Sequence, residues 1–267
     1  MKIKYLRHLI LSVLFTATII LVTGCDTVPI TGRSQINFIP ADQEMTLGLS
    51  SFETLKKSTP ISKDAAANAL VQKVGHRIAA VTGKDMPNAQ WEFVVFESKE
   101  ANAFCLPGGK VGVYTGILPI TKDEAGLATV IGHEVSHAVA KHGAERMSEG
   151  MMAQFGGELL GVAASSADPR WQALLNSAYG IGAQDFVLPA HSRKQESEAD
   201  HIGLIYMARA GYDPEAAVQF WQRFSDFNKQ NGSGNTPSFL RTHPTDETRI
   251  QQLKSWLPEA KAQMKTQ

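Results

Sequence analysis

The chain has 267 residues, of which 43% are hydrophobic and 19% are charged, so it is long enough to fold around a sizeable core. Its 26 basic and 26 acidic residues balance, and removing residues 1–24, which carry three basic residues and no acidic one, leaves a net charge of −3. This charge excludes a protein whose default partner is nucleic acid or another polyanion.

The N-terminus predicts export. Three basic residues precede an apolar run over residues 9–22, which is shorter than the about 20 apolar residues that a membrane-spanning helix needs. The run ends in Val22-Thr-Gly-Cys25, which resembles the lipobox of bacterial lipoproteins, so we expect Cys25 to become the lipidated N-terminus. The alternative is a retained membrane anchor in which the cysteine is incidental.

Lipidation at Cys25 has two consequences. Residues 25–40 are polar and irregular, and we expect them to form a tether between the lipid and a domain over residues 41–267. Cys105 is left without a partner in the chain, so disulfides do not hold the fold. Asp26 resembles an inner-membrane retention signal, which weakly favours the inner membrane.

The first elements of the domain are two amphipathic helices, over residues 42–57 and 62–81, with apolar positions at helical spacing that we assign to the core. Aromatic and β-branched residues then predict strands over residues 91–96 and 110–118. Between the strands, the glycines at 108 and 109 allow a tight reversal of the chain.

The second predicted strand contains Gly112 and Gly116, which would let another backbone approach closely. One interpretation is an edge strand that binds an extended peptide through main-chain hydrogen bonds, with Gly112 and Val113 in contact with the substrate. The other is a hairpin that merely tolerates glycine.

A metal-binding motif follows. Thr121 and Glu124 predict a capping box, so a helix begins near residue 122 and carries His133-Glu-Val-Ser-His137. Histidines four residues apart share a helix face and can bind the same Zn²⁺, and Glu134 stands where a general base for the attacking water is needed. The motif lies in an apolar stretch, where a charged cluster would be costly unless it bound something. This favours a metal site over a chance match on a surface helix.

His142 suggests the three-histidine pattern of the metzincins. That pattern requires a glycine three residues after the second histidine and a third histidine three residues later, but the chain has Ala140 and Gly143 there. The pattern fails, and we expect His142 at a solvated helix end.

Residues 148–191 are rich in small residues and methionine and predict helical pieces that form either a mobile lid or a tightly packed small-residue helix. Ser192 and Gln195 then resemble a capping box for a helix that runs to about residue 210.

That helix carries Glu196-Ser-Glu-Ala-Asp200. Glu196 and Asp200 are four residues apart on one face, so Glu196 can supply the third metal ligand while Asp200 orients a ligating histidine. We expect Glu198 to face solvent, although a shifted register would exchange it with Glu196. Ion pairing across the helix surface would explain these acids without a metal.

The C-terminal part predicts helices from Asp213-Pro214 to about residue 229 and from 248 to about 265, with a flexible loop between them at 231–235. His243 is either a turn residue before Pro244 or a site residue that reaches the open metal position or donates to the developing oxyanion. Arg249 could anchor its loop.

The histidine motif at residues 133–137 and the acidic motif at residues 196–200 together resemble those of the gluzincin metallopeptidases of the HtpX, LoiP and BepA kind. That family also includes the CAAX prenyl endopeptidase and the mitochondrial OMA protease. The resemblance covers about residues 40–257. It includes Asn102-Ala-Phe104, residues 198–203 and 210–214, and the stretch from Thr242 to Arg249.

The resemblance implies an α+β fold, a mostly helical zincin-like domain with a small β-sheet. It implies one zinc ion per chain bound by His133, His137 and Glu196, with Glu134 as catalytic base. Asp200 would support a ligand, His243 would face the site and Asn102 would contact the substrate. HtpX-like members carry several membrane spans, and we expect none here after residue 24.

We therefore expect a lipid-anchored periplasmic zinc endopeptidase that acts on misfolded or unassembled envelope proteins. It would attach to the membrane through its N-terminal lipid and have no nucleic-acid partner. The alternative is a non-catalytic zinc-containing lipoprotein that serves as a chaperone or assembly factor for outer-membrane components.

Overall fold

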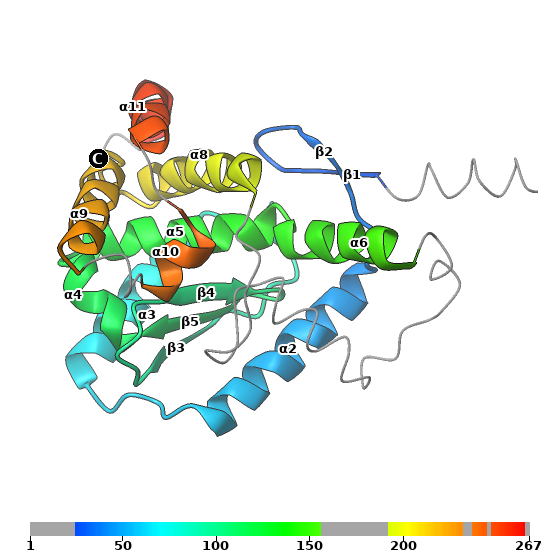
Figure 1. The fold of residues 1–267 in the computed structure, drawn as a ribbon, viewed down its shortest axis with the longest axis horizontal. Helices are drawn as coiled ribbons and strands as arrows, with labels where there is room; N and C mark the ends of the chain where they lie inside the picture. Colours follow the sequence, from blue (N-terminus) through cyan, green and yellow to red (C-terminus); the bar gives the residue numbers. More distant parts are fainter. Residues whose placement is uncertain (1–24, 156–191, 232–236, 245–246, 265–267) are drawn as a thin grey trace, which may run out of the picture.

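The computed structural model describes residues 25–155, 192–231, 237–244 and 247–264 (Figure 1). The predicted signal sequence, the predicted loop at 232–235 and the small-residue segment from residue 156 onward lie outside the described residues. Within the described ranges, no helix combines the length and the apolar character that a membrane span requires.

A three-stranded sheet forms one side of the domain. It contains β3 (Glu92–Phe96), β4 (Ala103–Leu106) and β5 (Lys110–Tyr114) in the order β3-β5-β4, with β3 parallel and β4 antiparallel to β5. Strand β4 lies where the sequence predicted only a connection between two strands. Its four apolar residues before the turn at Pro107-Gly-Gly109 are the signal for a hairpin strand, and Gly108 and Gly109 adopt φ values of 80° and 79° in that turn.

The edge-strand interpretation of β5 is wrong. The strand is central, and Gly112 lies opposite Val94 of β3 on one side and Phe104 of β4 on the other. Val113 is likewise paired on both sides, so β5 has no open edge at which a peptide could add. Glycine is needed for a different reason: a Cβ at Gly112 would lie 2.2 Å from the ring of Phe104.

The helices are arranged around α5, which lies between the sheet and α8 (Figure 1). Next to β3 lies α3, while α2 crosses the sheet and α9 and α11 form the outer side. Their bounds are α2 (Ala41–Ser58), α3 (Ala65–Ala79), α5 (Glu124–Val139), α8 (Arg193–Arg209), α9 (Glu215–Asn231) and α11 (Glu247–Ala262). Short helical segments η1 (Thr115–Ile117) and α4 (Leu118–Thr121) follow β5, where the sequence predicted a longer strand.

The central helix α5 begins two residues later than predicted. Thr121 closes α4, Lys122 adopts a positive φ of 71°, and Asp123 caps α5 by accepting a hydrogen bond of 2.8 Å from Gly126 N. The remainder of α5 is buried because the helix passes between two layers. Its approach to α8 is very close, since a Cβ at Gly203 would lie 3.2 Å from His133 N.

Residues 25–40 form no free tether in the structure. Strands β1 (Cys25–Thr27) and β2 (Ser34–Ile36) pair antiparallel, and we call residues 25–36 the N-terminal ribbon. Val28 is buried in the main core and Ile39 in a second apolar cluster, so the segment packs on the domain. The apolar residues within this otherwise polar stretch explain why it packs on the domain and does not form the predicted tether.

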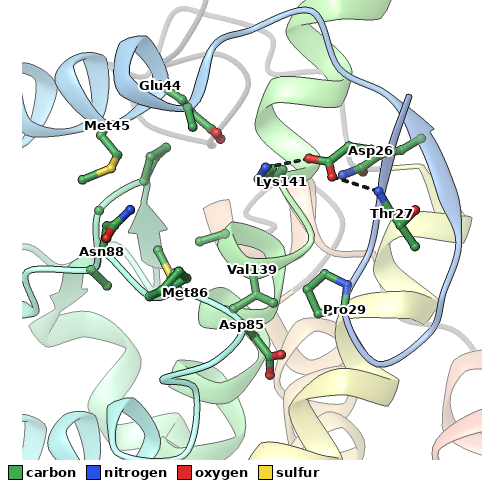
Figure 2. A pocket seen from close by; sticks show the side chains of 17 residues that line it. Asp26, Thr27, Pro29, Glu44, Met45, Asp85, Met86, Asn88, Val139 and Lys141 are labelled. Carbon is green, nitrogen blue, oxygen red and sulfur yellow. Dashed lines mark hydrogen bonds and ion pairs between the residues drawn. The ribbon is translucent and has the colours of Figure 1, made fainter. Parts of the chain in front are cut away.

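The ribbon borders a cavity of about 260 Å³ between α2, residues 85–89 and the C-terminal end of α5 (Figure 2). At its rim Lys141 Nζ lies 2.6 Å from Asp26 Oδ2, which ties the ribbon to the residue after α5. None of the residues predicted to bind a metal lines this cavity among the described residues.

Candidate metal centre

Two buried helices bring the predicted metal ligands together. His133 and His137 are on α5, and Glu196 is in the first turn of α8. The predicted capping box of α8 is confirmed: Ser192 Oγ accepts from Gln195 N at 3.2 Å, and the Gln195 side chain accepts from Ser192 N at 3.4 Å. This cap fixes where α8 begins, and the first turn then faces the histidines.

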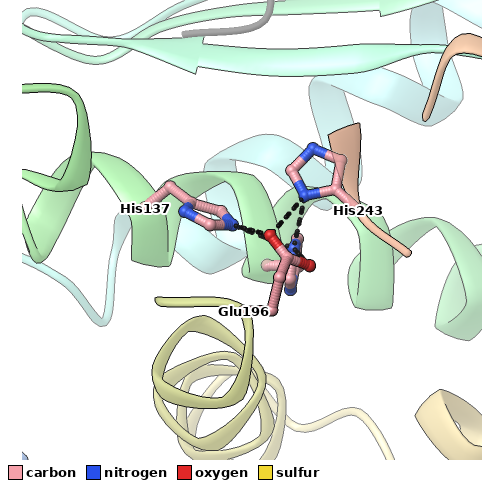
Figure 3. A group of neighbouring side chains, drawn as sticks. His137, Glu196 and His243 are labelled. Carbon is pink, nitrogen blue, oxygen red and sulfur yellow. Dashed lines mark hydrogen bonds and ion pairs between the residues drawn. The ribbon is translucent and has the colours of Figure 1, made fainter. Parts of the chain in front are cut away.

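The three ligand groups form a compact triangle. His133 Nε2 lies 3.0 Å from His137 Nε2 and 3.5 Å from Glu196 Oε2, and His137 Nε2 lies 3.2 Å from Glu196 Oε1. Figure 3 shows His137 and His243 both turned toward the Glu196 carboxylate. In a tetrahedral zinc site with bonds near 2.0–2.1 Å, ligand atoms are ~3.3 Å apart, so the donor set fits zinc.

His243 completes the cluster. It follows α10 (Ser238–Thr242), and its Nδ1 lies 2.9 Å from Glu196 Oε1 and 3.1 Å from His133 Nε2. One ligand atom from each of the four residues lies within 4.8 Å of the other three. The simple turn-residue interpretation does not account for this position, and the functional role of His243 stays a prediction.

Glu134 stands beside the cluster. Its Oε1 is buried with no hydrogen-bond partner among the described residues and lies 3.4 Å from His243 Nε2. Burial raises the pKa of Glu134, although His243 and His133 partly oppose the rise. A carboxylate with a raised pKa is a stronger base near neutral pH, which suits proton abstraction from water.

Asp200 orients His133, as its position four residues after Glu196 predicted. Its Oδ1 lies 2.9 Å from His133 Nδ1, which leaves Nε2 directed at the cluster. Burial alone would raise the pKa of Asp200, but Arg249 and His133 lower it below the ordinary value. The carboxylate is therefore ionised and accepts the proton of Nδ1.

Arg249 is the buried cation of the site. Its guanidinium donates to both Asp200 oxygens at 2.7 and 2.8 Å and lies 2.9 Å from Glu196 Oε2. It also donates to Pro244 O at 2.9 Å, which confirms that it anchors the His243 loop, and stacks 3.4 Å from the ring centroid of Trp221. Its contacts with the two carboxylates were not predicted from the sequence, because no spacing rule connects Glu196 and Asp200 to residue 249.

The electrostatics of the cluster favour a divalent cation. Three buried carboxylates, those of Glu134, Glu196 and Asp200, face the guanidinium of Arg249, which leaves two negative charges when these groups are ionised and the histidines are neutral, and one when His133 is protonated. Burial lowers the pKa of His133, but Glu196 and Asp200 outweigh it and raise the value to about 9. Burial holds the pKa of His137 well below its usual range, so that imidazole is neutral and offers a lone pair.

Glu198 and His142 contradict the predictions made for them. Both are buried, with 7% of Glu198 and none of His142 exposed, and Nε2 of His142 lies 3.0 Å from Glu198 Oε2. Lys141 adopts a positive φ of 51°, so the chain turns between α5 and α6 (His142–Phe155) and carries His142 back against His137. Glu196 and not Glu198 lies in the metal cluster, so the alternative helix register that would exchange these two residues is also wrong.

Asn102 lies at the start of β4 rather than in the metal cluster. Its carbonyl accepts from Tyr114 N at 3.0 Å and its side chain accepts from Ala103 N. The preceding Ala101 O accepts from Phe239 N of α10 at 3.1 Å, which links the edge strand to the segment that carries His243. Contact of Asn102 with substrate stays a prediction.

Comparison with known proteins gives a consistent result. Residues 65–257 match the model of Peptidase family M48. The mitochondrial metalloendopeptidase OMA1 of Schizosaccharomyces pombe is 36% identical over 250 residues, 91% of this chain and 70% of that protein. The human mitochondrial metalloendopeptidase OMA1 is 32% identical over 247 residues, 89% and 47% of the two chains. A putative beta-barrel assembly-enhancing protease of Vibrio cholerae is 30% identical over 216 residues, 78% and 43%.

The matched region contains Glu134 and the four residues that the structure brings together, His133, His137, Glu196 and His243. The relatives are named as peptidases, and the mostly helical domain with a small sheet agrees with the predicted fold class. These findings support the enzyme over the non-catalytic alternative. This chain belongs to Peptidase family M48 and is a metalloendopeptidase whose metal cluster contains His133, His137 and Glu196.

Proposed function

We propose that this metalloendopeptidase is a lipid-anchored zinc enzyme of the bacterial periplasm that degrades misfolded or unassembled envelope proteins. The observation that carries the peptidase activity is the convergence of His133, His137 and Glu196 with the carboxylate of Glu134 beside them. Imidazole and carboxylate donors in this arrangement suit zinc.

When bound, zinc acts as a Lewis acid that lowers the pKa of water and polarises a peptide carbonyl. Glu134 accepts the proton of the attacking water and returns it to the leaving nitrogen. The buried Oε1 of Glu134 lies 3.4 Å from His243 Nε2 but accepts no hydrogen bond from the described residues, so no fixed hydrogen bond there has to be broken for this exchange. Asp200 and Arg249 keep His133 in the tautomer that directs Nε2 at the metal.

The burial of the site supports unfolded chains as substrates. The four side chains of the cluster are only 2–3% exposed. The surface of a folded protein cannot reach side chains this deeply buried, so an extended, unfolded segment is the substrate form that this burial favours. The Vibrio cholerae relative is named a beta-barrel assembly-enhancing protease, which fits a substrate in the cell envelope.

The proposed location depends on the sequence before the domain. The basic start, the apolar run and Val22-Thr-Gly-Cys25 support export and lipidation at Cys25. Asp26 after the cysteine weakly favours the inner membrane.

Casein cleavage by the purified protein tests the activity. The wild type should contain one zinc per chain by elemental analysis and cleave casein, and Glu134→Gln should keep the zinc and lose cleavage, because it removes the base and no ligand. A Glu134→Gln variant that cleaves casein at the wild-type rate would overturn the mechanism. Wild-type protein that is fully folded yet holds no zinc would overturn the choice of metal.

A further inference from the structure

His137 has a buried partner on the ring nitrogen that faces away from the metal cluster. Its Nδ1 lies 2.8 Å from Nδ1 of His142, and the two ring centroids are 4.9 Å apart at an interplanar angle of 72°. On the far side of the His142 ring, Nε2 lies 3.0 Å from Glu198 Oε2. The three side chains therefore form a continuous line from the ligand to a carboxylate.

This line determines which nitrogen of each ring carries a proton. The ionised Glu198 carboxylate can only accept, so Nε2 of His142 must donate. In a neutral imidazole the other nitrogen, Nδ1 of His142, is then an acceptor. His137 Nδ1 must donate to it, which leaves Nε2 of His137 with the lone pair that a metal ligand needs.

Glu198 is held in turn by the N-terminal ribbon. Thr31 Oγ1 donates to Glu198 Oε1 at 2.5 Å and Arg33 Nε donates to Oε2 at 2.6 Å. The same guanidinium donates to both oxygens of Glu145, at 2.6 and 2.9 Å, and Glu145 accepts from Gln195 Nε2 at 2.8 Å. The Glu198 carboxylate is thus the acceptor for Thr31, Arg33 and His142 at once, which is the hydrogen-bonding pattern of an ionised carboxylate.

The two histidine ligands are thus supported in the same way from opposite sides. His133 is oriented by Asp200, which Arg249 holds, and His137 is oriented through His142 by Glu198, which Arg33 holds. In both cases an arginine fixes a carboxylate, and the carboxylate fixes a tautomer. Such outer hydrogen bonds commonly tune the affinity of a metal site.

We propose that His142, Glu198 and Arg33 are positioning residues for His137, so that the N-terminal ribbon sets the affinity and geometry of the metal site from outside it. The inference rests on the metal site of the proposed peptidase. Under this inference the segment that follows Cys25 belongs to the active site, because Arg33 and Thr31 can contact Glu198 only when the N-terminal ribbon is packed on the domain.

The decisive variants alter His142 itself. His142→Phe keeps a ring but removes both nitrogens, whereas His142→Asn places a carbonyl oxygen where Nδ1 accepts the proton of His137. The zinc dissociation constant, measured by competition with a chromogenic chelator, should rise about 10–100-fold in His142→Phe. His142→Asn should recover most of that loss. The visible spectrum of the Co²⁺-substituted protein should shift in His142→Phe and return toward wild type in His142→Asn.

Two ribbon variants separate positioning from general stability. Arg33→Met releases Glu198 and should weaken zinc binding. Asp26→Asn removes a different ribbon contact, the ion pair with Lys141 in Figure 2, and should leave zinc binding unchanged. Melting temperatures recorded with zinc and with EDTA show whether each variant is folded. A purely structural role would lower both melting temperatures without changing the zinc dissociation constant.

The outcomes distinguish the inference from the proposed function. Folded His142→Phe with wild-type zinc affinity, or His142→Asn no better than His142→Phe, would overturn the inference while leaving the peptidase intact. If His142→Phe fails to fold, the zinc affinity of Arg33→Met is the deciding measurement. An Arg33→Met protein with the zinc affinity of the wild type would overturn the inference. Wild-type protein that binds no zinc would instead overturn the proposed function.

Discussion

His243 Nδ1 lies 2.9 Å from Glu196 Oε1, and Nε2 of the same ring lies 3.4 Å from Glu134 Oε1. One imidazole therefore lies between Glu196 of the metal cluster and Glu134, the predicted catalytic base. The preceding helix α10 is hydrogen-bonded to Ala101, two residues before the edge strand β4, and Arg249 donates to the carbonyl of Pro244, the residue after His243. This arrangement favours a role in which His243 blocks the open metal position until substrate arrives.

If His243 blocks the metal site of the resting enzyme, removing its imidazole should raise the basal peptidase activity. We expect His243→Ala to cleave casein faster than the wild type, because an imidazole that occupies a ligand position has to leave before turnover. The measurement is the initial rate of casein cleavage at equal zinc content. A fall of about 10²–10³-fold would instead assign His243 to stabilisation of the oxyanion, and an unchanged rate would reject both roles.

Glu196 and its neighbour Glu198 should differ in zinc stoichiometry. We expect Glu196→Gln and His137→Ala to abolish stoichiometric zinc, because each removes a donor atom from the triangle around the metal. Glu198→Gln should retain one zinc per chain, since Glu198 contacts His142 rather than the cluster, although its affinity should fall. Elemental analysis after gel filtration gives the readout. Zinc retained by Glu196→Gln and lost from Glu198→Gln would reverse the assignment.

Lipid attachment should depend on Cys25. Cys25→Ser should accumulate as an unprocessed precursor without lipid, because acylation of the thiol precedes cleavage in lipoprotein maturation. Labelling with radioactive palmitate and the mobility of the protein on a gel report the two steps. Equal label in the wild type and the variant would contradict the lipobox assignment.

Gly112 should matter for packing rather than for substrate binding. A Cβ there would lie 2.2 Å from the Phe104 ring, so Gly112→Ala should lower the free energy of unfolding by about 1–3 kcal/mol. Gly83→Ala is the matched control, because nothing lies within 4 Å of its added Cβ. Urea unfolding measures both, and casein kinetics should show an unchanged KM in any folded Gly112→Ala protein. A raised KM without loss of stability would restore the substrate-binding interpretation.

Arg249 should be among the most sensitive positions for stability. Arg249→Met leaves the buried carboxylates of Asp200 and Glu196 without their cation, and breaking a buried ion pair in this way costs about 3–5 kcal/mol. Lys261→Met removes a cation from the exposed pair with Glu215 and should produce no measurable change. Urea unfolding in zinc-saturated buffer compares the two variants. Equal stability of both would contradict a structural role for Arg249.

The sequence by itself determined the parts of the site that depend on helix periodicity. His133 and His137, or Glu196 and Asp200, share a face because residues four apart always do in a helix, whatever surrounds it. The capping box of Ser192 and Gln195 is equally local, since its hydrogen bonds span three residues. These local rules were sufficient to predict the residues of the metal cluster on α5 and α8 and the carboxylate that contacts His133, whereas the role of Glu134 as the base stays a prediction.

Only the tertiary structure decided which strand lies at the edge of the sheet and which acidic residues are buried. The pairing of β5 with both β3 and β4 depends on segments outside its own sequence window, and so does the burial of Glu198 under Thr31 and Arg33. His142 reaches His137 because the backbone turns at Lys141, and Arg249 reaches Asp200 from another helix. Periodicity says which way a side chain points along its own helix, but burial and pairing are set by whatever distant segment packs against that face.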